Sequence, residues 1–331
     1  MPESRSEVGS LALLPEKMVH SLECVRIEEY IGSTGRKVNF SSSRKETFVA
    51  VEFVKKVRVD DTLEMGYYVD DCTDPWTTPD TIVLLHGNRK PRQIFYAWIP
   101  TLARRFEVIR PHLRGHWDST PAPEGYQWTV EGLVSDLKNF LDMLGMGKVH
   151  LVGESLGGLL GYHFAYHYRE RLKTLTLVTA PGPSFKHHPI VQAGGTENRP
   201  AWGVEDKKWK DQLILEFGPE NRALAEWTNA EVWNCQKEAT KGYFRAAANC
   251  EVNVEKFLSS INVPTLMMQG AECTRILTLQ EAQHFCNLMP QARLVTFSGV
   301  RAQCQFVIPE RCAQEVGRFI KEQEISRQLV S

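Results

Sequence analysis

The chain has 331 residues, which is enough for one large core or for a core that carries a smaller inserted domain. Hydrophobic residues make up 42% and charged residues 24% of it, and the net charge is −1. These values are ordinary for globular proteins, and there is no basic excess of the kind that nucleic-acid-binding proteins carry. No apolar run approaches the ~20 residues that a membrane-spanning helix needs. We therefore expect neither nucleic acid nor a membrane as a partner.

The first residues contain only one short apolar patch, Leu11 to Leu14. A signal peptide needs an apolar core of roughly 7–15 residues, so we expect no export and a cytoplasmic protein. The eight cysteines are scattered, without a Cys-x-x-Cys pair or a cluster of Cys and His. We expect reduced thiols, no metal site and no cofactor.

Residues 1–45 are predicted to form an N-terminal extension, because "IGSTGRKVNFSSSRKE" is polar and rich in Ser and Gly. Two β-rich runs follow, "TFVAVEFVKKVRV" and "LEMGYYVDD", and they predict an antiparallel pair at the edge of a sheet.

From residue 80 onward, compact apolar runs end in Gly, Ser or Pro. They are "TIVLLHG", "FEVIRPHLRG", "KVHLVGES", "LKTLTLVTAPG", "PTLMMQG" and "ARLVTFSG". Most are separated by segments such as "VEGLVSDLKNFLDMLG", in which apolar residues recur at the i, i+3 and i+4 positions of a helix. Strands that alternate with helices indicate an α/β fold with a mostly parallel sheet, covered by helices on both faces.

This alternation breaks over residues 183–258, which read as helical and contain four tryptophans, Trp202, Trp209, Trp227 and Trp233. We interpret the segment as an inserted helical cap. Its tryptophans would either line a pocket or hold the cap to the core. The core is then formed by residues 46–182 and 259–323, and residues 324–331 form a C-terminal tail.

The stretch "KVHLVGESLGGLLGYHFAYH" places Ser155 between a buried strand and an apolar helix, with Gly153 and Gly157 on either side. In the Gly-x-Ser-x-Gly turn the glycines allow strand and helix to approach closely, which lifts the serine above the sheet. The serine then lies at a helix N-terminus, where backbone N–H groups can bind an oxyanion. Ser155 is therefore the candidate nucleophile.

In these residues, and in "LLHGN" (84–88) and "HLRGHWDST" (112–120), the chain resembles the α/β-hydrolase fold superfamily over roughly residues 45–323. The resemblance implies an α/β-hydrolase fold with an inserted cap. It also implies an oxyanion hole formed by the backbone N–H groups of Asn88 and Leu156. His86 would support the oxyanion loop through hydrogen bonds.

The same resemblance exposes two replaced positions. The usual acid follows the strand "PTLMMQG" in a Gly-x-x-Asp pattern, which here reads "GAEC" and places Cys273 at the acid position. The usual histidine lies seven residues before a proline, and counting back from Pro309 gives Ala302. A serine needs a base to take its proton, and a carboxylate orients that base, so both partners of Ser155 are missing.

Other side chains could serve as a relocated base or could line a pocket. His187 and His188 follow the sixth strand, at the rim where α/β sheets bind ligands. The remaining candidates are His86, Tyr96, Trp98 and Trp202. For the two histidines of the rim, a plain solvent-exposed loop is the competing interpretation.

Three functions remain open. The first is an enzyme that acts on a small, largely apolar molecule by cyclisation, condensation, isomerisation or C–C cleavage, as in secondary metabolism, and uses the oxyanion hole without acylating Ser155. The second is a serine esterase or lactonase with a relocated base such as His188. The third is a binding protein without catalysis. All three imply a small-molecule ligand, and the oligomeric state stays open.

Overall fold

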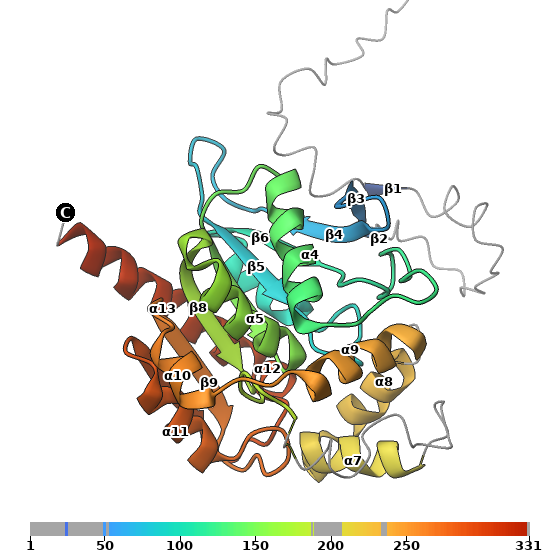
Figure 1. Ribbon diagram of the computed structural model, residues 1–331. Helices are drawn as coiled ribbons and strands as arrows, with labels where there is room; N and C mark the ends of the chain where they lie inside the picture. Colours follow the sequence, from blue (N-terminus) through green and yellow to red (C-terminus); the bar gives the residue numbers. More distant parts are fainter. Residues whose placement is uncertain are drawn as a thin grey trace, which may run out of the picture.

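The computed structural model of the chain describes residues 24–25, 49–50, 53–186, 188, 207–232 and 237–329. Within them an eight-stranded sheet has the order β10-β9-β8-β7-β5-β6-β4-β3, with helices on both faces (Figure 1). The strands are β3 (Lys55–Arg58), β4 (Glu64–Asp70), β5 (Thr81–Leu85), β6 (Glu107–Pro111), β7 (Val149–Glu154), β8 (Leu172–Val178), β9 (Thr265–Gly270) and β10 (Ala292–Phe297). The predicted fold class is confirmed.

The strands from β10 to β6 are parallel to one another. β4 runs antiparallel to β6, and β3 runs antiparallel to β4. β3 pairs with β4 in the register Lys55↔Tyr67, so the predicted antiparallel pair at the sheet edge is confirmed. A separate pair joins β1 (Cys24–Val25) to β2 (Val49–Ala50), with Cys24 opposite Ala50. The rest of the predicted extension lies outside the described residues.

Two hydrophobic cores cover the two faces of the sheet. Val83 and Leu85 of β5 point into one core, whereas Ile82 and Leu84 point into the other. Both faces of the strand are buried, which explains why its sequence is a continuous apolar run and does not alternate with polar residues. On the first face lie α4 (Val130–Met143), α5 (Leu156–His167), α10 (Val254–Ser259) and α11 (Leu279–Leu288). On the second lie α3 (Ile99–Leu102), α12 (Cys304–Val307) and α13 (Pro309–Gln328).

Three further helices lie between β8 and β9 in the sequence, in the segment predicted as the cap. They are α7 (Lys207–Phe217), α8 (Arg222–Val232) and α9 (Lys237–Asn249) (Figure 1). Leu213, Phe217 and Ala225 from α7 and α8 join the core on the α13 face. Tyr243 and its neighbours on α9 join the core on the α4 face. The three helices therefore contact both layers of the molecule.

Short 3-10 turns complete the described structure: η1 (Tyr96–Trp98), η2 (Arg169–Arg171) and η3 (Pro219–Asn221). Helix α13 continues to Gln328, so residues 324–328 of the predicted tail are helical. No helix in the described part of the chain is both long and apolar enough to span a membrane.

The turn between β7 and α5 requires its glycines for steric reasons. A Cβ atom at Gly157 would lie 2.5 Å from the carbonyl oxygen of Leu85 and 2.7 Å from that of His86. A Cβ atom at Gly153 would lie 2.3 Å from the carbonyl oxygen of Gly157. These are backbone atoms, which cannot rotate away as a side chain can. The close approach of strand, helix and oxyanion loop therefore depends on the missing side chains.

We predict that Gly157→Ala lowers the free energy of unfolding by about 1–3 kcal/mol or more, because the backbone must shift to accept the methyl group. Gly147→Ala is the matched control, since a Cβ there meets no atom within 4 Å. It should change stability by less than about 0.5 kcal/mol. Urea denaturation of both variants measures the difference. Equal stabilities of the two variants would contradict the steric interpretation of the turn.

Candidate functional site

Ser155 lies at the N-terminal end of α5 in a strained backbone conformation, with φ 49° and ψ −116°. A non-glycine residue in this region is uncommon and is found where the surrounding structure enforces it. The N–H of Ser155 donates to the carbonyl of Val178 at 3.0 Å, which ties the turn to β8. Among the described residues no side chain forms a hydrogen bond with the Ser155 hydroxyl. The serine is thus positioned as in a nucleophile elbow but has no base beside it in this part of the chain.

The loop after β5 passes directly over the elbow. A Cβ atom at Gly87 would lie 3.0 Å from the Cβ of Ser155. The backbone N–H of Asn88 has no hydrogen-bond partner among the described residues, and that of Leu156 lies at the first position of α5, where a helix offers none. The side chain of Asn88 donates from Nδ2 to the carbonyl of Thr240 on α9, at 2.9 Å. Leu156 directly follows Ser155, and the loop that carries Asn88 approaches the serine at Gly87 and is tied to α9.

His86 supports this loop through the hydrogen bonds of its ring. Its Nε2 accepts from the N–H of Leu113 at 3.0 Å, so Nδ1 carries the proton and donates to the carbonyl of Gly87 at 2.8 Å. Burial, followed by the nearby His116, holds the pKa of His86 well below its usual value. Both ring nitrogens are used and the ring is neutral, so His86 acts as a structural support and cannot serve as a relocated base.

Glu154 immediately precedes Ser155, and its carboxylate is completely buried. Oε2 accepts from the N–H of Gly87 at 3.1 Å, and Oε1 lies 3.1 Å from the Nζ of Lys90. Burial raises the pKa of Glu154, and the Lys90 ammonium and the Gly87 N–H oppose that rise. One carboxylate thus holds this loop at two points, Gly87 and Lys90, on either side of Asn88.

The C-terminal loop, where a histidine would be expected, contributes two buried glutamines to the same network. Gln305 donates from Nε2 to Glu154 Oε1 at 3.2 Å and to Gln303 Oε1 at 2.8 Å. Gln303 Oε1 also accepts from Lys90 Nζ at 2.8 Å, and its Nε2 donates to Glu216 of α7 at 2.8 Å. Side-chain amides do not titrate in water, so these residues bind and orient but cannot accept the proton of Ser155.

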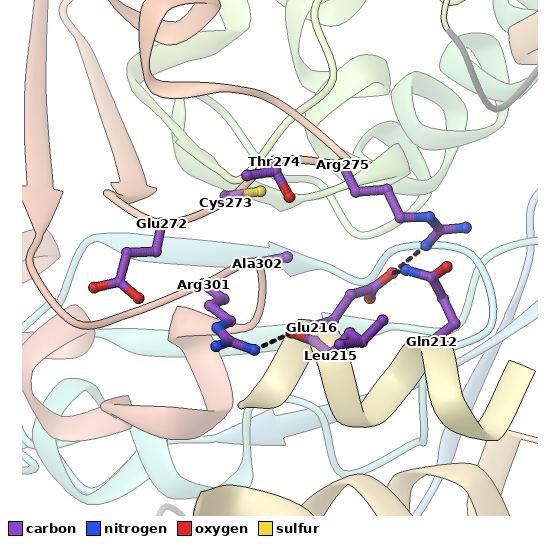
Figure 2. A pocket seen from close by; sticks show the side chains of 9 residues that line it. All are labelled: Gln212, Leu215, Glu216, Glu272, Cys273, Thr274, Arg275, Arg301 and Ala302. Atoms are coloured by element: carbon purple, nitrogen blue, oxygen red, sulfur yellow. Dashed lines mark hydrogen bonds and ion pairs between the residues drawn. The ribbon is translucent and has the colours of Figure 1, made fainter. Parts of the chain in front are cut away.

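The two replaced positions lie on neighbouring loops. The N–H of Glu272 donates to the carbonyl of Val300 at 3.0 Å, which joins the loop after β9 to the loop after β10. Cys273 and Ala302 are both buried, and the side chains of Cys273 and Glu272 point in different directions (Figure 2). Neither position carries an acid or a base, so the described loops provide no acid–histidine pair for Ser155.

A pocket with a volume of about 410 Å³ opens at these positions (Figure 2). It lies between α7 and the loops after β9 and β10. The residues that line it are Gln212, Leu215, Glu216, Glu272, Cys273, Thr274, Arg275, Arg301 and Ala302. None of them is aromatic, so this pocket differs from the aromatic pocket that the tryptophans suggested.

The aromatic candidates have mainly structural positions. Trp98 is fully buried and donates from Nε1 to the carbonyl of Gln305 at 3.0 Å, so it anchors the C-terminal loop. Tyr96 is half-exposed, and its ring lies 6.4 Å from that of Trp227 on α8. Trp227 also contacts Phe306, at 6.3 Å between ring centroids, and therefore helps to hold α8 to the core.

His188 is the described member of the predicted histidine pair, and His187 and Trp202 lie outside the described residues. The Nε2–H of His188 donates to the carbonyl of Ile276 at 3.0 Å, and the ring stacks on Phe185 with 4.1 Å between centroids. Burial lowers the pKa of His188, and the hydrogen bond to Ile276 opposes this. If His188 acts as a base, it must do so through Nδ1.

Sequence reasoning did not identify one group of potential metal ligands. Asp80, His150 and Glu324 place their ligand atoms within 4.8 Å of one another. Asp80 and His150 lie at the amino ends of β5 and β7, whereas Ser155 follows the carboxyl end of β7. Asp80 is already paired with the ammonium of Lys173, and His150 Nδ1 lies 2.9 Å from the hydroxyl of Thr174. These contacts satisfy the group without a metal ion.

We predict that Lys90→Met lowers the free energy of unfolding by about 3–5 kcal/mol, because it leaves Glu154 as a buried charge without its counter-charge. Combining it with Glu154→Gln should restore part of this loss, since a neutral amide can still accept from the Gly87 N–H. The expected coupling energy is about 1–3 kcal/mol in a double-mutant cycle measured by urea denaturation. A double variant that loses the full sum of the two single losses would show that the pair is not coupled.

Comparison with known proteins agrees with this geometry. A family model described as alpha/beta hydrolase fold matches residues 80–223. The 2-hydroxy-6-oxo-2,4-heptadienoate hydrolase of Pseudomonas putida is 26% identical over 231 residues, which are 65% of this chain and 80% of that protein. A soluble epoxide hydrolase of a Corynebacterium species is 35% identical over 100 residues, 29% of this chain and only 33% of that protein.

The likeness extends to three-dimensional structure. The crystal structure of a hydrolase from Pseudomonas aeruginosa superposes with a TM-score of 0.69 at 23% sequence identity, covering 81% of this chain and 98% of the other. The family model, the nucleophile elbow and the sheet order all lead to the same assignment. The chain has the α/β-hydrolase fold, and residues 80–223 match the model of that family.

Proposed function

We propose that this chain is an enzyme that acts on a small, largely apolar organic molecule through its oxyanion hole, without forming an acyl-enzyme on Ser155. The backbone N–H groups of Asn88 and Leu156 would stabilise negative charge on a carbonyl oxygen of the substrate. The Ser155 hydroxyl would act as a neutral hydrogen-bond donor beside them. Cyclisation, condensation, isomerisation and C–C cleavage are reactions that such a site can promote by charge stabilisation and positioning.

One observation supports this proposal above all others. The C-terminal loop fills the space beside the elbow with Gln303 and Gln305, whose amides bind Lys90 and Glu154. An amide cannot take a proton from serine, and Cys273 leaves no carboxylate to orient a base. The oxyanion loop, in contrast, is supported by His86 and by Glu154. The part of the site that stabilises negative charge is kept, while the part that activates the serine is replaced.

A serine hydrolase is the second candidate, and two observations favour it. The first relative is named as a hydrolase of a heptadienoate. Ser155 also keeps the strained backbone that holds a nucleophile above the sheet. This alternative requires a base from elsewhere, and Nδ1 of His188 is the described candidate. A binding protein without catalysis is the remaining alternative, and it would retain ligand affinity without forming a product.

We predict that a fluorophosphonate probe labels the protein at least about 100-fold more slowly than a conventional serine hydrolase, because general-base assistance contributes that much or more. Intact mass spectrometry follows the adduct, with Ser155→Ala as the control for labelling elsewhere. Rapid labelling of Ser155 would overturn the proposal. In that case His188→Ala, assayed for both labelling and ester turnover, would show whether His188 is the relocated base.

A converse experiment places an acid and a histidine at the two replaced positions. The double variant Cys273→Asp with Ala302→His should label with the probe about 100-fold faster than the natural chain, because it supplies a base and an orienting acid. Cys273→Asn with Ala302→His is the matched control, since an amide of similar size cannot stabilise the imidazolium. A folded double variant that labels no faster than this control would show that positions 273 and 302 do not face Ser155.

A further inference from the structure

The pocket of Figure 2 contains four charged side chains, and their hydrogen bonds can be accounted for one by one. Glu216 is nearly fully buried and has three partners. Its Oε2 accepts from Gln303 at 2.8 Å, and its Oε1 accepts from Gln212 at 3.3 Å and pairs with Arg275. The Glu216 carboxylate therefore already has three partners within the protein.

The two arginines are in a different situation. Arg275 uses Nη1 for Glu216, and Arg301 uses Nη1 for the carbonyl of Leu215 at 3.0 Å. A guanidinium carries five N–H donors in a rigid fork, and within the described residues these are the hydrogen bonds that the two groups form. Both guanidinium groups are thus held in place by α7 and still have several donors available.

The other open charge is Glu272, which is exposed at the far side of Arg301 and points away from Arg275 (Figure 2). Water solvates such a carboxylate well, so it demands no partner from a ligand. The positively charged donors that the pocket wall offers are the guanidinium groups of Arg275 and Arg301. A ligand that complements this wall must bring acceptors with negative charge.

We propose that this pocket binds a carboxylate group of the substrate, with Arg275 and Arg301 as the donors. The inference extends the proposed function, since Ala302 in the pocket wall directly precedes Gln303, which belongs to the network beside Ser155. Positions that carry a proton-transfer pair in a conventional hydrolase would then hold one end of the substrate. The name of the Pseudomonas putida relative, a heptadienoate hydrolase, describes a substrate with such a group.

The test uses binding and needs no turnover. Full-length protein carrying Ser155→Ala is titrated with 4-phenylbutanoate and, separately, with the uncharged 4-phenylbutanamide, by calorimetry at low ionic strength. We expect the acid to bind at least tenfold more tightly than the amide, and Arg301→Met to remove most of this preference. Glu272→Gln should act in the opposite direction and tighten binding of the acid about twofold, because it removes a like charge.

Two further variants make the result specific to the pocket. Arg275→Lys keeps the charge next to Glu216 but loses the guanidinium fork, so the acid should bind several-fold more weakly. Arg222→Met is the matched control, because Arg222 is an exposed arginine of α8 whose ion pair among the described residues is with Glu226, four residues later. It should leave the preference unchanged. Equal affinities for acid and amide, or an equal loss in Arg222→Met and Arg301→Met, would overturn the carboxylate site. Both results are independent of whether Ser155 reacts with a fluorophosphonate.

Discussion

A single buried carboxylate, that of Glu154, connects the parts of this site. It lies next to Ser155, it accepts from Gly87 in the oxyanion loop, and it receives Gln305 from the C-terminal loop. A buried charge is very costly unless it is paired and fully hydrogen-bonded, and Lys90 provides the pair. The three segments therefore cannot be placed independently, because the elbow carries the carboxylate and the other two loops contribute the donors that it needs.

In the proposed function the site lacks a proton-transfer pair, and this constraint explains how it would still keep its shape. In a conventional triad the histidine connects the C-terminal loop to the serine. Here the amides of Gln303 and Gln305 connect the same loop to Lys90 and Glu154, next to the serine. The connection is retained with groups that do not titrate. The elbow and the oxyanion loop are thereby held together although the base is absent from the described loops.

Much of this fold could be predicted from sequence, because its signals are local. Apolar runs, helical periodicity and the Gly-x-Ser-x-Gly turn each depend on residues within a short window. The two replaced positions could be proposed from sequence as well, because they lie at fixed distances from recognisable strands. The network could not be predicted, since Lys90 and Gln303 are 213 residues apart and neither belongs to a motif.

Trp98 illustrates the same limit. Its position after the oxyanion loop left open whether it packs or lines a pocket, and its indole N–H bonds the carbonyl of Gln305, 207 residues later. The residue type alone does not distinguish an aromatic side chain that anchors a loop from one that touches a ligand. The pocket at Cys273 and Ala302 was likewise missed, because it depends on α7 approaching two loops that follow it in the sequence.

The hydrogen bond from Asn88 to Thr240 has a thermodynamic consequence. It joins Asn88, the residue proposed to offer an oxyanion N–H, to helix α9. Any movement of α9 away from the core must break this bond and free the oxyanion loop at that point. Binding of a molecule that stabilises α9 in place therefore also favours the ordered oxyanion loop, and by linkage an anion bound at the loop favours the placed helix by the same free energy. The placement of α9 and the affinity of the loop for an anion are therefore coupled through the same equilibrium.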